Sequence, residues 1–132
     1  MSWKENRKVK LFSVSETGAV RKQWKGRVRV ALVYPNIYEL GMSNLGFQAV
    51  YNLLNGLDSV LCERAFLPET DASPLQTIES SRRLADFDII AFSVSFENDF
   101  ANILSILERA GLPLKAIDRG IPHPLVMAGG VA

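Results

Sequence analysis

Cysteine and histidine are scarce in this sequence, which has one of each, Cys62 and His123, in 132 residues. No disulfide can form within these residues, and zinc sites built from four cysteines are excluded. Apolar runs reach only about eight residues, whereas a helix that crosses a membrane needs about 20. The N-terminal stretch MSWKENRKVK lacks the apolar segment of a secretory signal. These absences predict a cytoplasmic protein without a membrane span.

A charge excess of one sign is also missing, because 15 Lys and Arg residues face 14 Asp and Glu residues, for a net charge of +1. This balance gives no electrostatic support for nucleic-acid binding by these residues. Hydrophobic residues make up 48% of the chain and charged residues 22%, as in ordinary globular domains. The chain is long and apolar enough for one domain with a hydrophobic core.

Residues 1–26 differ from the rest of the chain. They are rich in Lys and Arg and hold both tryptophans, Trp3 and Trp24. Short alternation around a turn at residues 16–18 permits a hairpin, and a basic, solvated extension is the alternative. We therefore expect an N-terminal extension over residues 1–26 and an α/β domain over residues 27–132.

From residue 27, apolar strands alternate with helical patterns. The patterns predict strands at 27–34, 59–66, 88–94 and 124–130, helices at 43–56, 74–85 and 98–111, and a short helical piece at 114–118. Ser43 is the expected N-cap of the first helix, and Ser73, Pro74 and Gln76 form a start signal for the second. This order indicates βαβ units and a doubly wound, mostly parallel sheet of the flavodoxin-like or Rossmann-like type, with strand order 2-1-3-4.

Apolar stripes are also visible within two of the predicted helices. The first helix carries Leu45, Ala49, Val50, Leu53 and Leu54, and the third carries Phe100, Ile103, Leu104 and Leu107.

Ligands of such sheets bind beyond the carboxyl ends of the strands, at the switch point beside the first strand. The loops at 35–44, 93–98 and 129–132 should therefore form any site. Gly41 and Gly46 have the spacing of a phosphate-binding loop, but Phe47 and Gln48 stand where Lys and Ser or Thr are required. The dinucleotide fingerprint G-x-G-x-x-G is absent as well, so a common phosphate loop is excluded.

The three loops taken together resemble those of cobalamin-binding domains, whose signatures are D-x-H-x-x-G, S-x-L and G-G. The matching positions are Asn36-x-Tyr38-x-x-Gly41, Ser93-Val94-Ser95 and Gly129-Gly130. The stretch VYPNIYELGMSNLGFQAVYNLLN, with CERAF after it, is similar more specifically to the N-terminal region of a radical SAM (Fe–S oxidoreductase) family. In that family this domain precedes a TIM-barrel-like catalytic domain that uses S-adenosylmethionine and a 4Fe–4S cluster.

The resemblance implies a set of cofactor-binding residues for cobalamin: Asn36, Tyr38, Gly41, Met42, Ser93, Ser95, Gly129 and Gly130. Two departures matter. Tyr38 replaces the histidine that ligates cobalt, and Asn36 replaces the aspartate that orients this histidine. We therefore expect either cobalamin bound without histidine ligation or a degenerate domain that docks on the catalytic barrel.

The cluster-binding motif C-x-x-x-C-x-x-C is missing, so the iron–sulfur cluster and S-adenosylmethionine should belong to a downstream domain. No catalytic or metal-binding residue is expected in this chain, which by itself should be inactive. The chain also stops after its fourth predicted strand, where a loop and helix should follow. We therefore expect a fragment that is truncated at its C-terminus and whose partner is the catalytic domain of the same polypeptide.

Two other readings remain open: a structural docking module without a cofactor, and a Rossmann-like domain that binds a nucleotide or S-adenosylmethionine itself. Among single residues, Cys62 is expected in the core and His123 in a loop, and Glu63 and Arg64 are expected to form an exposed pair. Asn98 or Asp99 is expected to cap the helix that follows. The substrate and the oligomeric state do not follow from the sequence.

Overall fold

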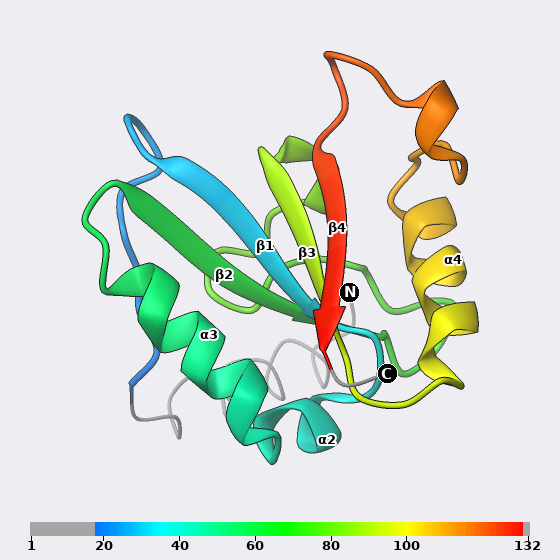
Figure 1. Ribbon diagram of the computed structural model, residues 1–132, viewed down its shortest axis with the longest axis horizontal. Coiled ribbons are helices and arrows are strands. Elements are labelled where there is room, and N and C mark those ends of the chain that lie inside the picture. Colours follow the sequence, from blue (N-terminus) through cyan, green and yellow to red (C-terminus); the bar gives the residue numbers. More distant parts are fainter. Residues whose placement is uncertain (1–17, 131–132) are drawn as a thin grey trace.

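The computed structural model describes residues 18–130, which form a four-stranded parallel sheet with chain packed on both faces (Figure 1). The strand order is β2-β1-β3-β4, as predicted. The strands are β1 (Val28–Tyr34), β2 (Val60–Phe66), β3 (Ile89–Val94) and β4 (Leu125–Gly130). The helices are α2 (Tyr38–Met42), α3 (Leu45–Asn55) and α4 (Asp99–Arg109), with 3-10 turns η1 (Leu84–Asp86) and η2 (Ala116–Asp118). The doubly wound α/β fold predicted from the sequence is confirmed.

The position of β1 at the centre of the sheet explains why its sequence is continuously apolar. Its last five residues are buried, because chain covers both faces of the sheet there. Val30, Leu32 and Tyr34 pack on the α3 side, which we call the front face. Ala31 and Val33 pack on the opposite side, the back face.

On the front face, α3 covers β1 and β2 with two aromatic side chains, Phe47 and Tyr51, which are buried. Of the apolar stripe seen in the sequence, Leu54 packs against this cluster, but Leu45 is 81% and Leu53 73% exposed. The two rings lie four residues apart on one side of the helix and bury more area than leucine does. The N-cap is Asn44 rather than Ser43, because the Asn44 side chain accepts a hydrogen bond from the Phe47 N–H.

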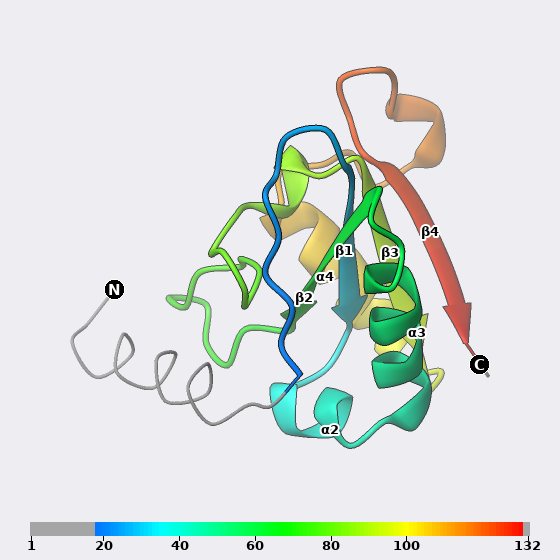
Figure 2. The same ribbon diagram turned by 90° about the vertical axis from the view of Figure 1, so that its left-hand side faces the viewer.

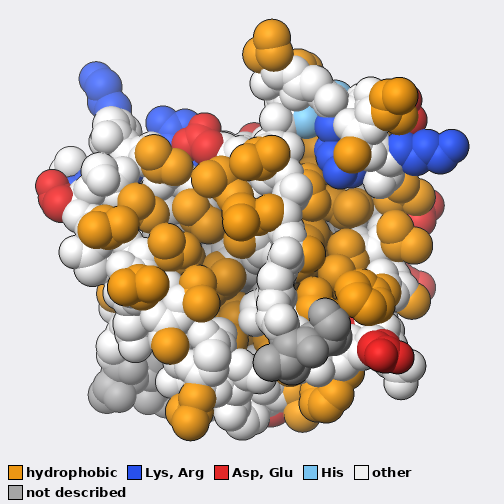
Figure 3. Space-filling model, viewed as in Figure 1, with side chains coloured by type: hydrophobic (Ala, Val, Ile, Leu, Met, Phe, Trp, Pro, Cys, Tyr) orange, Lys and Arg blue, Asp and Glu red, His pale blue; other side chains and the backbone are white. Residues whose placement is uncertain are grey.

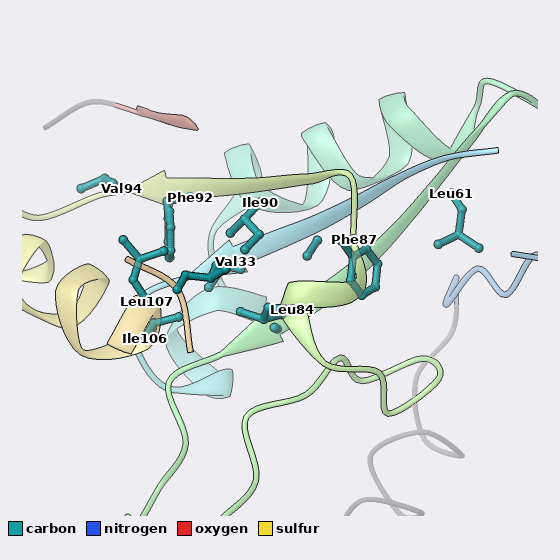
Figure 4. Packing of buried hydrophobic residues seen from close by; sticks show 12 residues of the cluster. Val33, Leu61, Leu84, Phe87, Ile90, Phe92, Val94, Ile106 and Leu107 are labelled. Carbon is teal, nitrogen blue, oxygen red and sulfur yellow. The ribbon is translucent and has the colours of Figure 1, made fainter. Parts of the chain in front are cut away.

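On the back face, α4 packs through Ile106 and Leu107 against β3 (Figure 4). Phe100 and Leu104, which belong to the predicted stripe of this helix, are about half exposed. Asn98 occupies the N-cap position, but its side chain makes no capping hydrogen bond. Leu107 and Ile103 of the predicted stripe do pack on the core, so the buried side of α4 includes half of that stripe together with Ile106.

The helix predicted over residues 74–85 is wrong, since only the short turn η1 forms there. The segment instead runs along the outer edge of β2, where the Ile78 N–H donates to the Arg64 carbonyl. We call residues 76–82 the strap; Figure 2 shows it on the side of the sheet opposite α3. The strap supplies hydroxyl groups to buried Glu63, so tertiary contacts override the capping signal at Ser73.

Residues 18–26 pack on the domain through specific contacts. Lys22 Nζ donates to the carbonyls of Asn55 and Leu57 at the C-terminal end of α3, where a cation is favoured. It also donates to the carbonyl of Val60, the first residue of β2. The ring of Trp24 meets the ring of Phe87 edge-on, with a centroid distance of 4.8 Å. The hairpin that the sequence permits around residues 16–18 falls largely outside the described residues.

Candidate functional site

A pocket opens on the front face beside the carboxyl ends of β1 and β3. It has a volume of about 350 Å³ and lies between α3 and the surface of β3 and β4. Its lining is mostly apolar and holds no charged side chain. The lining residues are Leu32, Asn44, Gly46, Val50, Ala91, Phe92, Ser93, Val94, Ser95, Met127, Ala128, Gly129 and Gly130. This is the switch point of the sheet, where doubly wound domains bind their ligands.

Four of the eight residues predicted for the site line this pocket: Ser93, Ser95, Gly129 and Gly130. Ser93 and Gly129 face each other across neighbouring strands, because they are paired in the β3–β4 register. The parallel sheet therefore brings together two loops that are far apart in the sequence.

The polar rim of the pocket depends on Asn44, a residue that the sequence analysis did not select. Asn44 Nδ2 donates to Ser95 Oγ at 2.9 Å, while Asn44 Oδ1 accepts the Phe47 N–H at 2.9 Å. One amide thus caps α3 and fixes the hydroxyl that follows β3. The bond to Ser95 spans 51 residues of sequence, so no local pattern indicates it.

The two glycines of β4 have different roles. Gly130 has φ +136°, and a Cβ atom there would overlap the carbonyl oxygen of Val94, so β4 approaches β3 too closely for a side chain. At Gly129 a Cβ atom would meet nothing within 4 Å. Gly130 is therefore required by the backbone, whereas Gly129 leaves room in the pocket.

The other four predicted residues do not line the pocket. Tyr38 lies in α2 and packs edge-on against Phe66 of β2, at a centroid distance of 5.1 Å. A Cβ atom at Gly41 would overlap the ring of Phe66, so this glycine permits close packing of α2 on the sheet. Met42 Sδ accepts a hydrogen bond from Arg64 Nη1 at 3.4 Å. The loop after β1 is thus directed toward β2.

Asn36 is held by the first turn of α4. Its Nδ2 donates to Asp99 Oδ1 at 3.0 Å, and its Oδ1 accepts the N–H of Ile37. Asn102 Nδ2 donates to the Pro35 carbonyl at 2.9 Å, which gives the loop a second anchor. Asp99 is 2% exposed, and its Oδ2 has no hydrogen-bond partner among the described residues. Asn36 therefore serves loop geometry and does not orient Tyr38.

A buried charged network joins α3, β2 and the strap, away from the pocket. Arg64 Nε donates to Glu79 Oε2 at 2.7 Å, and the Tyr51 hydroxyl donates to the same oxygen at 2.7 Å. Arg64 and Glu63 are each 3% exposed, so the expectation of an exposed pair is wrong. The two side chains point to opposite faces of β2, and each binds the strap rather than the other.

Burial dominates the acid–base properties of this network. It raises the pKa of Glu79, although the Arg64 guanidinium opposes the rise. Burial also raises the pKa of the Tyr51 phenol, and the neighbouring Glu79 carboxylate adds to this. The network ties the strap and α3 to β2, which is a structural task.

The sequence-based expectations for the lone cysteine and histidine agree with the structure. Cys62 is buried on the front face of β2, and burial raises the pKa of its thiol to about 12. His123 lies in the loop before the amino end of β4, where its Nδ1 accepts the Gly120 N–H. Within residues 18–130, no group of three or more His, Cys, Asp or Glu side chains could hold a metal ion.

Comparison with known protein families gives a match that extends over most of the domain. Residues 46–132 fit the family model described as "Radical SAM proteins, N-terminal". The chain belongs to this family. No match was found among curated proteins or among solved structures.

This N-terminal domain of radical SAM proteins combines a parallel sheet with an apolar pocket that the Ser93 and Ser95 hydroxyls line. Its described residues contain no helix with the length and hydrophobicity to cross a membrane. The pocket lacks charged groups and can therefore hold a flat or apolar group, with Ser93 and Ser95 as hydrogen-bonding partners. Its lining contains no carboxylate, histidine, lysine or cysteine side chain that could act as a general acid or base there.

Proposed function

We propose that this chain is the accessory N-terminal domain of a radical SAM enzyme, and that the front pocket receives the nucleotide tail of cobalamin. In this proposal the chain supplies no lower axial ligand to cobalt. The observation that carries it is the pocket at the switch point, which gathers Ser93, Ser95 and Gly129 from separate segments. Pockets of this kind are the default ligand sites of open α/β sheets.

The chain fits the nucleotide tail of cobalamin but offers no ligand for the lower axial position of its cobalt. A flat heterocycle suits the apolar walls, two hydroxyls are available to its polar atoms, and Gly129 leaves open space. The axial position does not fit, because Tyr38 packs on Phe66 and His123 lies at the amino end of β4. The proposal therefore keeps the tail site and omits protein ligation of cobalt.

The remaining cofactors belong to the catalytic part of the polypeptide. A 4Fe–4S cluster requires cysteine thiolates, and Cys62 is a single, buried residue with a raised pKa. When bound there, the cluster and S-adenosylmethionine would supply the radical chemistry. This domain would contribute binding and orientation of a second cofactor.

The test uses the full-length protein, reconstituted with iron and sulfide and then incubated with cobalamin. We expect one cobalamin per chain after gel filtration, and a spectrum without an imidazole nitrogen on cobalt. Gly129→Val should weaken binding at least tenfold, because the added side chain enters the pocket. Gly120→Val is the matched control, since a Cβ atom there also meets open space but lies in the loop before β4. Equal affinity of the two variants would refute the tail site.

A second candidate function is docking on the catalytic domain without any cofactor. The observation in its favour is the exposed apolar row of α3 beside the pocket, where Leu45 and Leu53 are largely uncovered. In that case cobalamin does not bind, and Leu53→Glu should loosen the contact between the two domains in the full chain. Faster proteolysis between the domains, with Asn52→Glu as the control on the same helix, would support this alternative.

A further inference from the structure

Three polar side chains, Asn44, Ser93 and Ser95, line the front pocket, and the rest of its lining is apolar side chain or glycine. Figure 3 looks onto this face and shows hydrophobic side chains around the β4 backbone. In such surroundings a few hydrogen bonds orient a ligand, and each bond must join a donor to an acceptor. The direction of these bonds therefore determines which polar atoms a ligand can place in the pocket.

The orientation of the Asn44 amide is fixed by the helix that it caps. Its Oδ1 accepts the Phe47 N–H at 2.9 Å, a bond that the amide oxygen can make and the amide nitrogen cannot. The nitrogen must then occupy the other position, where Nδ2 lies 2.9 Å from Ser95 Oγ. Because an amide nitrogen only donates, Ser95 Oγ is the acceptor in this bond.

This bond leaves the hydroxyl proton of Ser95 unused. A serine hydroxyl can donate one hydrogen bond and accept others, and among residues 18–130 the Ser95 hydroxyl has only the bond that it accepts from Asn44. Ser95 lines the pocket, so a group that enters the pocket can receive this proton. Ser93 is not polarised in this way, because its hydroxyl has no partner within the described part of the chain and can serve a donor or an acceptor.

Ser95 also stands at a position where the sequence departs from its resemblance to cobalamin-binding domains. It is the third residue of Ser93-Val94-Ser95, where the S-x-L signature has leucine. A leucine side chain neither donates nor accepts a hydrogen bond. The Ser95 hydroxyl, with Asn44 opposite it at the start of α3, is therefore a polar pair for which that resemblance does not account.

We propose that the Asn44–Ser95 pair makes the front pocket selective for a ligand atom that accepts a hydrogen bond, such as a ring nitrogen or a carbonyl oxygen. Ser95 touches the ligand, and Asn44 is the positioning residue that sets the preference. This selectivity rests on the proposed function only in that the front pocket is a binding site. The expected discrimination against a ligand without the acceptor is about three- to tenfold, the contribution of one net hydrogen bond.

The test compares two uncharged bicyclic probes of the same shape, 1-methylbenzimidazole and 1-methylindole, which differ by a ring nitrogen in place of a C–H group. Their binding to the full-length protein is measured by ligand-observed NMR. Gly129→Val, which puts a side chain into the pocket, identifies the part of the binding that occurs there. We expect 1-methylbenzimidazole to bind about three- to tenfold more tightly. Equal affinities, or no binding that Gly129→Val removes, would overturn the proposal.

Asn44→Asp reverses the polarity of the pair and keeps the helix cap. Aspartate caps a helix about as well as asparagine does, so the Phe47 N–H keeps its acceptor and the melting temperature should not fall. The carboxylate has no proton to donate, so the Ser95 hydroxyl donates to it and presents lone pairs to the pocket. The preference for 1-methylbenzimidazole should then disappear. Because both probes are uncharged and alike in shape, the added negative charge acts on them equally.

Ser95→Ala removes the hydroxyl and should abolish the preference as well. Ser95→Thr is the matched control, because it keeps the hydroxyl and should keep the preference. An unchanged preference in Asn44→Asp would show that Asn44 does not set the polarity and would overturn the proposal. A full-length protein that discriminates between the two probes but binds no cobalamin would refute the proposed function and support the selectivity.

Discussion

Removal of the Glu79 carboxylate tests how the strap is held to the sheet. Glu79 accepts three hydrogen bonds, from Arg64 Nε at 2.7 Å, from the Arg64 N–H at 2.9 Å and from the Tyr51 hydroxyl at 2.7 Å. The Arg64 and Glu79 side chains are 4% and 1% exposed. Glu79→Ala therefore leaves a buried guanidinium without its carboxylate and a buried phenol without its acceptor.

The expected magnitude follows from that geometry. Breaking a buried ion pair by removing one partner costs about 3–5 kcal/mol, because the remaining charge stays desolvated. Arg64 cannot easily turn to solvent, since its guanidinium lies 4.6 Å from the centre of the Tyr51 ring and donates to Met42 Sδ. We expect Glu79→Ala to lower the free energy of unfolding by about 3–5 kcal/mol.

Urea denaturation monitored by tryptophan fluorescence measures this loss, because Trp24 packs on Phe87 in the back-face core. The double variant Arg64→Met with Glu79→Leu should be more stable than Glu79→Ala, since it leaves no unpaired charge. Asp86→Ala is the control: it breaks an ion pair with Arg83 that lies at the surface, and the midpoint should not move. A Glu79→Ala protein as stable as this control would refute the assignment of the network as the anchor of the strap.

Three further outcomes are expected. Because burial raises the pKa of Cys62 to about 12, its thiolate should be about a thousandfold scarcer than that of an exposed thiol. Iodoacetamide should therefore label Cys62 only after unfolding. Since the pKa of Cys62 is higher in the folded than in the unfolded protein, the free energy of unfolding should fall as the pH rises above about 9. Gly130→Ala should lower the unfolding midpoint, whereas Gly129→Ala should not, and equal midpoints would contradict the close approach of β4 to Val94. Lys22→Met should cost about 1 kcal/mol through the lost bonds to the end of α3 and the start of β2, and an unchanged urea midpoint would show that these bonds contribute nothing.

The sheet was predictable from the sequence because its signal is redundant. Each strand is a short apolar run between helical or loop patterns, and the right-handed crossover rule restricts the order in which such runs can pair. The helix predicted at 74–85 failed for a different reason. Its start signal is local, but Glu63 and Arg64 are buried on β2 and need partners, which Thr77 and Glu79 supply only when the segment lies along the sheet edge.

The candidate site was predictable only where it is built from strand ends. Ser93 and Gly129 follow directly from the order and direction of the strands. Asn44 was missed as a site residue because its role depends on a hydrogen bond to Ser95, which lies 51 residues away. Asp99, outside the pocket, was missed as the partner of Asn36 for the same reason, since the two are 63 residues apart. Tyr38 was selected by its motif position, yet its ring packs against Phe66, a contact that the motif does not indicate.

The edge of the sheet at the carboxyl ends of the strands is therefore divided into two halves, one filled by side chains and one open. The half toward β2 is filled: Gly41 admits the ring of Phe66, and Tyr38 covers the same ring edge-on. A side chain could reach a ligand from this half only by giving up that aromatic packing, which is worth about 0.5–1.5 kcal/mol beyond the buried area. The half toward β4 is open, and its lining includes Ser93 and Gly129, which are paired across β3 and β4. Side-chain contacts to a group in the pocket should thus come from the ends of β3 and β4 rather than from the loop after β1.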